Sequence, residues 1–202
     1  MDREDWNRRY EGSELVWTAE PNRFLVAEVE GLTPGRALDL ACGEGRNAVW
    51  LAERGWRVSG VDFSDVAVAK ARALAGSRGL DVEWIVADLV DFRPEPRAFE
   101  LVVLLYLQLP SAERGPIVRR AVAAVARGGT FLLVGHDRRN LEDGYGGPRD
   151  PDVLYTPEDV VSDLDGVEGL AVERAELVRR PVATPEGDRV ALDALVRVAR
   201  TA

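Results

Sequence analysis

Residues 38–47 read LDLACGEGRN, and this stretch decides the fold. The apolar, β-prone run predicts a strand over 36–41, and the spacing of apolar residues after it predicts a helix over 47–52. Gly43 and Gly45 supply the turn between them. A strand that enters a helix through a glycine turn is typical of the βαβ units that build parallel sheets.

The same alternation of β-rich runs and helix-period stretches continues outward along the chain. Further elements are expected as strands at 56–61, 82–86, 99–105 and 130–135, and as helices at 65–75, after the cap Ser64, and at 111–126, before Gly128 and Gly129. Two closing β-rich runs, 170–178 and 189–198, flank residues 181–188 and predict an antiparallel hairpin. The expected fold is therefore α/β: a doubly wound, Rossmann-like, mostly parallel seven-stranded sheet with an antiparallel C-terminal hairpin and helices on both faces.

Length favours a single domain over residues 1–202. Two amphipathic segments, at 5–10 and 21–29, predict that residues 1–30 form an N-terminal helical cap or lid. Residues 142–152 are rich in Gly, Pro and Asp, so we expect a loop there.

Composition narrows the class of protein. The formal net charge of −9 repels a phosphate backbone and an anionic lipid surface, so we expect neither a nucleic-acid acceptor nor a membrane partner. The sequence contains no apolar run long enough to span a bilayer and its charged N-terminus predicts no signal peptide, so a cytoplasmic location is expected. Cys42 is the single cysteine, which excludes an internal disulfide and a cysteine-rich zinc site, and we expect no metal.

Three predicted strand ends form a candidate ligand site. In a doubly wound sheet, ligands bind outside the carboxyl ends of the strands, and glycines there let the backbone come close to them. Asp62 ends the second predicted strand, where a carboxylate can accept hydrogen bonds from both hydroxyls of a ribose. Asp88 ends the third, where a carboxylate can accept one from the exocyclic amine of an adenine. A glycine turn with these two acceptors fits an adenosine ligand.

The spacing Gly43-x-Gly45-x-x-Ala48 also fits the loose dinucleotide-binding pattern. Asp39 within the first strand and Glu44 inside the turn disfavour a dinucleotide, because Glu44 would repel a pyrophosphate. S-adenosylmethionine (SAM) has no phosphate and carries a cationic sulfonium, so it tolerates carboxylates there. An NAD-linked oxidoreductase remains the less favoured alternative.

On these motifs the chain resembles the class I SAM-dependent methyltransferases. Residues 38–47 are similar to motif I of that family, GVDFS at 60–64 to motif II, and VADL at 86–89 to the third-strand motif. The closing hairpin is similar to the antiparallel strand of the family. Within the family, GRNAVWLA at 45–52 and WNRRY at 6–10 resemble the tellurite-resistance and thiopurine methyltransferase branch.

The resemblance implies SAM as cofactor and the transfer of its methyl group to a small-molecule acceptor by direct displacement. Asp39 would anchor the amino group of the methionine part directly or through water, with a structural role toward the amides of the turn as the alternative, and Asp62 would hold the ribose. The cofactor-binding residues that it implies are Asp39, Ala41, Gly43, Gly45, Asn47, Asp62, Phe63, Asp88 and Leu89. Ala41 stands where motif I usually has its first glycine, and we expect a slight adjustment there with binding retained.

Catalytic residues are expected where the acceptor would approach. The resemblance places Tyr106, just past the fourth strand, near the methyl group. His136, the single histidine, follows the fifth strand and is a candidate base, with a purely structural loop residue as the alternative. The candidates for acceptor binding or a lid are the aromatic residues Trp6, Tyr10, Tyr106 and Tyr145.

A second function class stays open at this point: a protein that binds SAM or S-adenosylhomocysteine (SAH) without transferring a methyl group. Methyl transfer depends chiefly on alignment of the reacting atoms, so the sequence need not display a strong catalytic residue in either case. The attacked atom of the acceptor (O, N, S or a metalloid) and the oligomeric state are not specified by any of these motifs.

Overall fold

A single sheet forms the centre of the molecule. In the computed structural model, which describes residues 2–12 and 14–202, seven strands form this sheet in the order β3-β2-β1-β4-β5-β7-β6. The strands are β1 (Arg36–Leu40), β2 (Arg57–Asp62), β3 (Glu83–Val86), β4 (Phe99–Leu105), β5 (Val125–His136), β6 (Leu170–Thr184) and β7 (Gly187–Arg200). β1 to β5 are parallel, and β7 runs antiparallel to β5 and to β6. The predicted Rossmann-like α/β fold with an antiparallel hairpin is confirmed.

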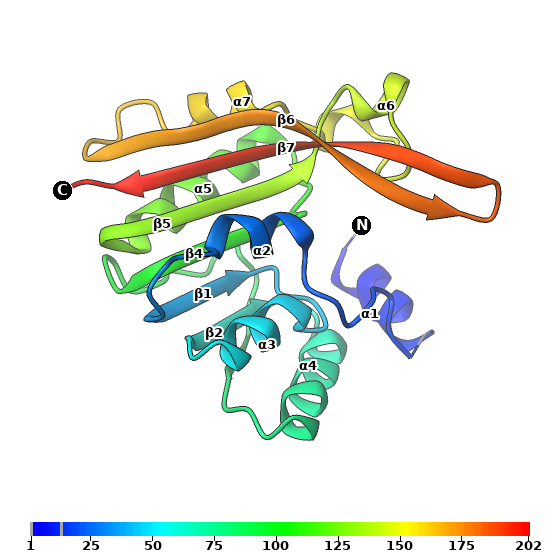
Figure 1. Ribbon diagram of the computed structural model, residues 1–202, viewed down its shortest axis with the longest axis horizontal. Helices are drawn as coiled ribbons and strands as arrows, with labels where there is room; N and C mark the ends of the chain where they lie inside the picture. Colours follow the sequence, from blue (N-terminus) through cyan, green and yellow to red (C-terminus); the bar gives the residue numbers. More distant parts are fainter. Residues whose placement is uncertain (1, 13) are drawn as a thin grey trace.

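Helices cover both faces of this sheet. One face packs against α2, α3 and α4, and the other against α5 and α7. The helices are α1 (Arg3–Glu11), α2 (Arg23–Val29), α3 (Arg46–Glu53), α4 (Asp65–Ser77), α5 (Ser111–Ala124), α6 (Asn140–Asp143) and α7 (Pro157–Asp163), with a 3-10 turn, η1 (Pro151–Val153). Figure 1 shows α1 beside the carboxyl ends of the central strands. In the part of the chain that the structure describes, no helix is both long and apolar enough to cross a membrane.

Alternation along the strands gives each face its own core. Leu38 and Leu40 of β1 pack with the cluster under α5 and α7, whereas Ala37 packs with the cluster under α2 and α3. β4 alternates in the same way and is buried along nearly its whole length, as a central strand should be. Because side chains alternate, Asp39 falls on the face of Ala37, and a carboxylate is thereby placed inside an apolar layer.

One predicted helix boundary is wrong. The helix expected to continue to residue 126 ends at Ala124, and β5 begins at Val125, earlier than expected. Val125 pairs with Phe99 of β4. Residues 125 and 126, which the sequence pattern assigns to the helix, therefore belong to β5. Gly128, with a φ of 77°, makes the irregular turn before regular pairing resumes.

The closing hairpin is longer than predicted. β6 and β7 pair as far as Thr184 and Gly187, so most of the residues between the two predicted runs, 181–188, also belong to the strands. Pro181 lies within β6, which is an edge strand and therefore tolerates a residue without an N–H group. The tip of the hairpin projects beyond the rest of the sheet on the side of α1 (Figure 1).

Candidate cofactor and acceptor site

The turn between β1 and α3 has an unusual backbone conformation. Ala41, Gly43 and Gly45 have positive φ angles of 59°, 54° and 81°. The backbone N–H of Cys42 donates to the carbonyl of Val61 at 3.0 Å, which ties the turn to β2. Ala41 therefore adopts a left-handed conformation that a side chain disfavours, at the position where motif I usually has glycine.

The two glycines of the turn serve different contacts. A Cβ atom on Gly45 would lie 2.6 Å from the Trp84 ring and 2.7 Å from the Cβ of Ala71, so Gly45 allows α3 to pack closely against β3 and α4. A Cβ atom on Gly43 would lie 3.1 Å from the hydroxyl of Tyr10. Gly43 thus faces the N-terminal helix, and Gly45 faces the interior of the fold.

Asp62, at the end of β2, holds this turn with its buried carboxylate. Its Oδ2 accepts a hydrogen bond from the backbone N–H of Gly43, and its Oδ1 accepts one from that of Ser64, both at 2.9 Å. Burial raises the pKa of Asp62, and these backbone N–H groups oppose that rise. A carboxylate offers about four acceptor positions, so ribose hydroxyls can still bind to it.

Asp39 makes no such hydrogen bonds to the part of the chain that the structure describes, and the backbone N–H of Ala48 is the smallest of the influences on its pKa. Asp39 is 1% exposed, and neither of its carboxylate oxygens has a hydrogen-bond partner among the described residues. Burial, and then the negative charge of Asp62, raises the pKa of Asp39 from its ordinary value of 3.8 to about 7. A buried polar group without a partner is costly for the fold, which makes Asp39 a candidate ligand-binding residue.

Arg46 is the first residue of α3. Its positive charge lies close enough to interact with the negative charge of Asp39. Burial lowers the pKa of Arg46, and the charges of Tyr106 and Asp39 act in the opposite direction. Within residues 2–12 and 14–202 its guanidinium makes no hydrogen bond and no ion pair. A carboxylate and a guanidinium without hydrogen-bond partners can bind the ammonium and the carboxylate of a zwitterion, such as the amino-acid end of a cofactor.

The end of β3 joins the same edge of the sheet. The backbone N–H of Ala87 donates to the carbonyl of Asp62 at 2.9 Å. Asp88 is exposed, and its Oδ1 accepts a hydrogen bond from the backbone N–H two residues further on. Leu89 is buried in the core, and Phe63 is half-buried. The structure thus brings the predicted cofactor-binding residues of β1, β2 and β3 to one edge of the sheet.

The N-terminal residues lie across this edge. Asn47 of α3, through its Oδ1, accepts a hydrogen bond from the backbone N–H of Asn22 at 2.8 Å, which anchors the start of α2. Tyr10 is buried and stacks on Trp6, with 5.5 Å between ring centroids. The hydroxyl of Tyr10 points at Gly43, so α1 covers the glycine turn.

Glu44 fastens the segment between α1 and α2. Its buried Oε2 accepts hydrogen bonds from the backbone N–H groups of Val16 at 2.9 Å and Trp17 at 3.2 Å. Its Oε1 lies 3.2 Å from Nζ of Lys70, and Lys70 also donates to the carbonyl of Tyr10. Glu44 therefore anchors this segment, and its negative charge in the turn also disfavours a pyrophosphate ligand.

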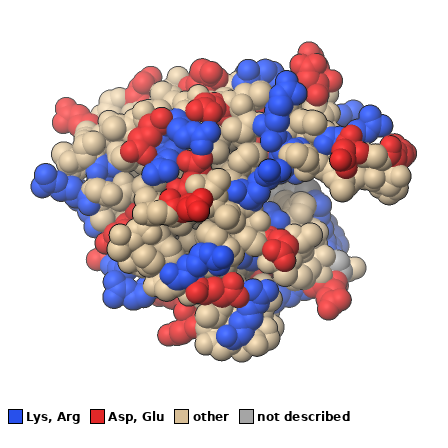
Figure 2. Space-filling model, viewed as in Figure 1, with Lys and Arg blue, Asp and Glu red and all other residues tan. Residues whose placement is uncertain are grey.

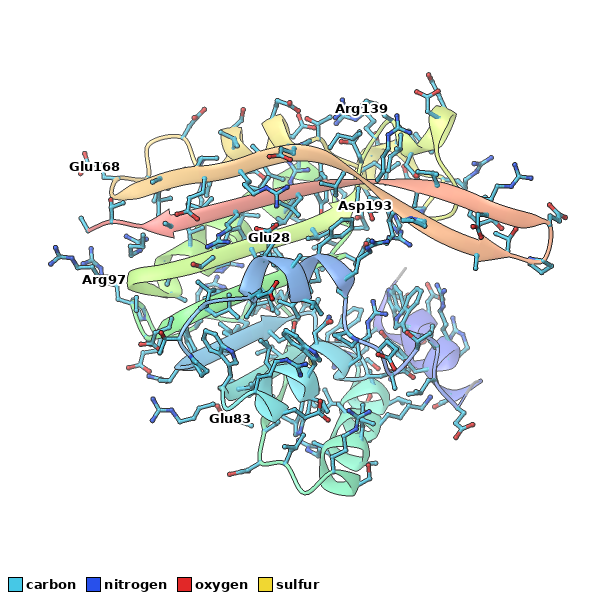
Figure 3. The ribbon with its side chains drawn as sticks, in the orientation of Figure 1. Glu28, Glu83, Arg97, Arg139, Glu168 and Asp193 are labelled. Carbon is cyan, nitrogen blue, oxygen red and sulfur yellow. The ribbon has the colours of Figure 1, made fainter. Side chains whose placement is uncertain are left out.

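A second group of residues lies at the carboxyl ends of β4 and β5. Tyr106 has a φ of 59°, and its ring centroid lies 4.9 Å from that of His136. The Tyr106 hydroxyl donates to Oδ2 of Asp193 at 2.9 Å, and Arg180 Nε donates to the same oxygen at 2.7 Å. Nδ1 of His136 lies 3.2 Å from Oδ1 of Asp193, a close contact that lacks the direction of a hydrogen bond. Figure 3 labels Asp193 on β7, close to the end of β5.

The loop after α6 contacts this group through a glycine. The side chain of Asn140 donates to the carbonyl of Gly146 at 2.6 Å and accepts from the backbone N–H of Leu192 at 2.8 Å, which pins the loop to β7. A Cβ atom on Gly147 would lie 2.9 Å from the His136 ring. Tyr145, predicted at the mouth of the site, is 46% exposed.

Three charged residues of the site were not predicted from the sequence: Arg46, Arg180 and Asp193. For Asp193 a signal exists, because it interrupts the apolar run ALDALV at 191–196. For Arg180 no signal exists, because its position relative to Tyr106 depends on the pairing of β6 with β7.

Part of the chain matches a family model and resembles curated proteins. Residues 37–129 match the family model Methyltransf_25, described as "Methyltransferase domain". The 2-heptyl-1-hydroxyquinolin-4(1H)-one methyltransferase of Mycobacteroides abscessus is 30% identical over 133 residues, 64% of this chain and 59% of the relative. The ribosomal RNA small subunit methyltransferase C of Alcanivorax borkumensis is 36% identical over 87 residues, 42% of this chain and 26% of the relative. The chain thus spans less than two thirds of the length of either relative.

Solved structures agree on the fold. The structure described as "Conversion of a Disulfide Bond into a Thioacetal Group during Echinomycin Biosynthesis" superposes with a TM-score of 0.78 at 22% identity, covering 98% of this chain and 91% of that one. TehB from Haemophilus influenzae superposes with a TM-score of 0.72 at 15% identity, covering 98% and 66%. The chain shares the Rossmann-like fold of these structures.

Proposed function

We propose that the chain is a SAM-dependent methyltransferase that transfers a methyl group to a small-molecule acceptor. When bound, SAM supplies a methyl group on a sulfonium centre. The observation that carries the proposal is the buried carboxylate of Asp39, which has no partner of its own, at the glycine turn of a methyltransferase-like sheet.

The described residues fit this cofactor. Asp39 offers two free acceptor oxygens for an ammonium group, and Arg46 offers free donors for a carboxylate. Asp62 keeps acceptor positions for ribose hydroxyls, and Asp88 lies on the neighbouring strand end for an adenine amine. Gly43, which has no side chain, lets the Tyr10 hydroxyl lie close against the backbone of the turn.

The contribution of the chain to catalysis is chiefly alignment. The fixed turn and the ends of β1 to β3 orient the donor, and Tyr106 at the end of the adjacent β4 lies where an acceptor would meet it. Trp6 and Tyr10 on the N-terminal cap, residues 1–30, would then exclude water from the reacting groups.

A small acceptor fits the surface better than a nucleic acid does. The chain carries a net charge of −9, and Figure 2 shows Lys and Arg intermixed with Asp and Glu over the face in view, without a continuous basic surface. Within the methyltransferases, the GRNAVWLA and WNRRY stretches favour the tellurite-resistance and thiopurine branch.

The test is a calorimetric titration followed by an assay with labelled SAM against a metabolite library. We expect SAM and SAH to bind, NADH not to bind, and at least one small molecule to become labelled. Binding of SAM without any labelled product would favour a SAM-binding protein, and tight NADH binding without SAM binding would favour the oxidoreductase.

A further inference from the structure

The cluster at the ends of β4 and β5 has the composition of a proton-transfer site. It joins an imidazole, a carboxylate, a phenol and a guanidinium, contributed by four different strands or strand ends: His136, Asp193, Tyr106 and Arg180. The antiparallel register places His136 directly opposite Asp193, so their side chains share one face of the sheet.

Asp193 is a buried, ionised carboxylate. It is 0% exposed, and burial alone would raise its pKa, but the contacts with His136 and Arg180 outweigh burial and hold the pKa below its ordinary value. Its negative charge therefore lies 3.2 Å from Nδ1 of His136. The negative charge of Asp193 would stabilise the positive charge that the ring gains when it takes up a proton.

The backbone and the ring of His136 are both held in place. The backbone N–H donates to Oε1 of Gln108 at 2.8 Å, and Gln108 in turn donates to the carbonyl of Val153 at 2.7 Å, which fixes the main chain at His136. Tyr106 packs on the ring, and Gly147 lies against it. A general base must be oriented in this way before it can accept a proton efficiently.

The second ring nitrogen is free to act. Nε2 of His136 makes no hydrogen bond with the residues that the structure describes, and it is not among their buried unpartnered atoms. The side chain keeps 15% of its surface exposed. Nδ1 therefore faces the buried carboxylate, and Nε2 faces the accessible side.

We propose that His136 is the general base of the methyl transfer, that Asp193 is its positioning residue, and that the acceptor is a hydroxyl compound. This inference rests on the proposed function. In the step, the acceptor oxygen bonds to the methyl carbon of the sulfonium donor while the carbon–sulfur bond breaks and leaves its electron pair on sulfur. The hydroxyl proton passes to Nε2 of His136. The contact of Nδ1 with Asp193 becomes a directed hydrogen bond when the acceptor binds, with the neutral ring donating its Nδ1–H to the carboxylate.

A hydroxyl is the acceptor class that gains most from such a base. An amine attacks through a lone pair before it loses a proton, and a thiol ionises readily near neutral pH. A hydroxyl holds its proton tightly and becomes a strong nucleophile only as that proton leaves. A positioned base is worth roughly 10²–10⁴-fold in rate for such a step.

The first test uses nuclear magnetic resonance of the full chain labelled with ¹⁵N-histidine, in which every imidazole signal belongs to His136 because the chain has one histidine. We expect the neutral ring to carry its proton on Nδ1 and to leave Nε2 bare, and Asp193→Asn to shift this balance, because the partner of one ring nitrogen sets the tautomer. A neutral ring with the proton on Nε2 in the wild type, or a tautomer unaffected by Asp193→Asn, would overturn the assignment.

The second test compares acceptors. Wild type, His136→Gln and the matched surface variant Arg179→Gln are assayed with labelled SAM against phenols, enols, alcohols, anilines and thiophenols, with SAM binding measured by calorimetry. We expect O-methylated products, a loss of roughly 10²-fold or more in His136→Gln with SAM affinity unchanged, and no loss in Arg179→Gln. Exclusive N- or S-methylation, full activity in His136→Gln, or SAM binding without methylation of any hydroxyl compound would contradict this inference. Failure of the wild type to bind SAM would instead refute the proposed function.

Discussion

The carboxylates of Asp39 and Asp62 are both buried at the glycine turn, but only that of Asp62 has hydrogen-bond partners. The hydrogen bonds of Asp62 therefore stabilise the folded chain, whereas the burial of Asp39 without hydrogen bonds destabilises it. The negative charge of Asp62 also adds to the effect of burial on the pKa of Asp39. This asymmetry gives the two residues different signatures on substitution, which separate binding from folding.

The pH dependence of stability isolates Asp39. Its pKa of about 7 in the folded chain exceeds its ordinary value of 3.8, so the folded state binds more protons between these values. Its contribution to the free energy of unfolding is therefore full below about pH 4 and falls by up to about 1.4 kcal/mol per pH unit toward pH 7. Denaturant unfolding at pH 5 and pH 7.5 should show this fall in the wild type and a smaller one in Asp39→Asn. Equal pH slopes in both proteins would refute the raised pKa.

Replacing Asp62 should harm both folding and binding. Asp62→Ala leaves the backbone N–H groups of Gly43 and Ser64 without their acceptor, which costs about 1–3 kcal/mol in the free energy of unfolding. The loss of hydrogen bonds to ribose should lower the affinity for SAM roughly tenfold or more. Urea unfolding and calorimetry measure the two effects. An unchanged SAM affinity would exclude Asp62 from the ribose site.

Introducing glycine at position 41 should raise the free energy of unfolding. Ala41 has a φ of 59°, which costs a residue with a side chain about 1–2 kcal/mol, and the greater unfolded-state entropy of glycine offsets part of that gain. We expect Ala41→Gly to raise the free energy of unfolding by about 0.5–1 kcal/mol. Ala98→Gly, at a position whose φ is not positive, is the control and should lower it. Destabilisation by Ala41→Gly would mean that the turn carries no backbone strain at this residue.

Glu44 should control the mobility of the N-terminal segment. Glu44→Gln removes the charge from the hydrogen bonds to the backbone N–H groups of Val16 and Trp17 and weakens the contact with Lys70. Because such charge-assisted bonds contribute about 1.5–3 kcal/mol, the amides of Val16 and Trp17 should exchange hydrogen roughly tenfold faster or more. Glu14→Gln, an exposed neighbour in the same segment, is the control. Identical exchange in Glu44→Gln and wild type would show that Glu44 does not fasten this segment.

The strand ends that form the cofactor side were predictable because local sequence specifies them. Gly43, Gly45, Asp62 and Asp88 lie at or shortly after the end of a strand, and a parallel sheet brings such ends to one edge. The end of α5 was not predictable, because Val125 is drawn into β5 by its pairing with Phe99, far away in the sequence.

The acceptor side was only half predictable for the same reason. Tyr106 and His136 follow parallel strands, so their positions were expected. Asp193 and Arg180 lie on the hairpin, and only the register of β5 with β7 and of β7 with β6 brings them to His136. Registers of this kind depend on the packing of the whole sheet, which short motifs do not encode.

The most direct test of the central claim is a calorimetric titration of SAM into the wild type and into Asp39→Asn, with the unfolding free energy of both measured at pH 7.5. Because Asp39 is buried without a partner in the apo protein and is proposed to hold the ammonium group of SAM, the substitution should leave the fold as stable or more stable while lowering SAM affinity roughly tenfold or more. Undiminished SAM affinity in Asp39→Asn would exclude Asp39 from the site that holds the ammonium group.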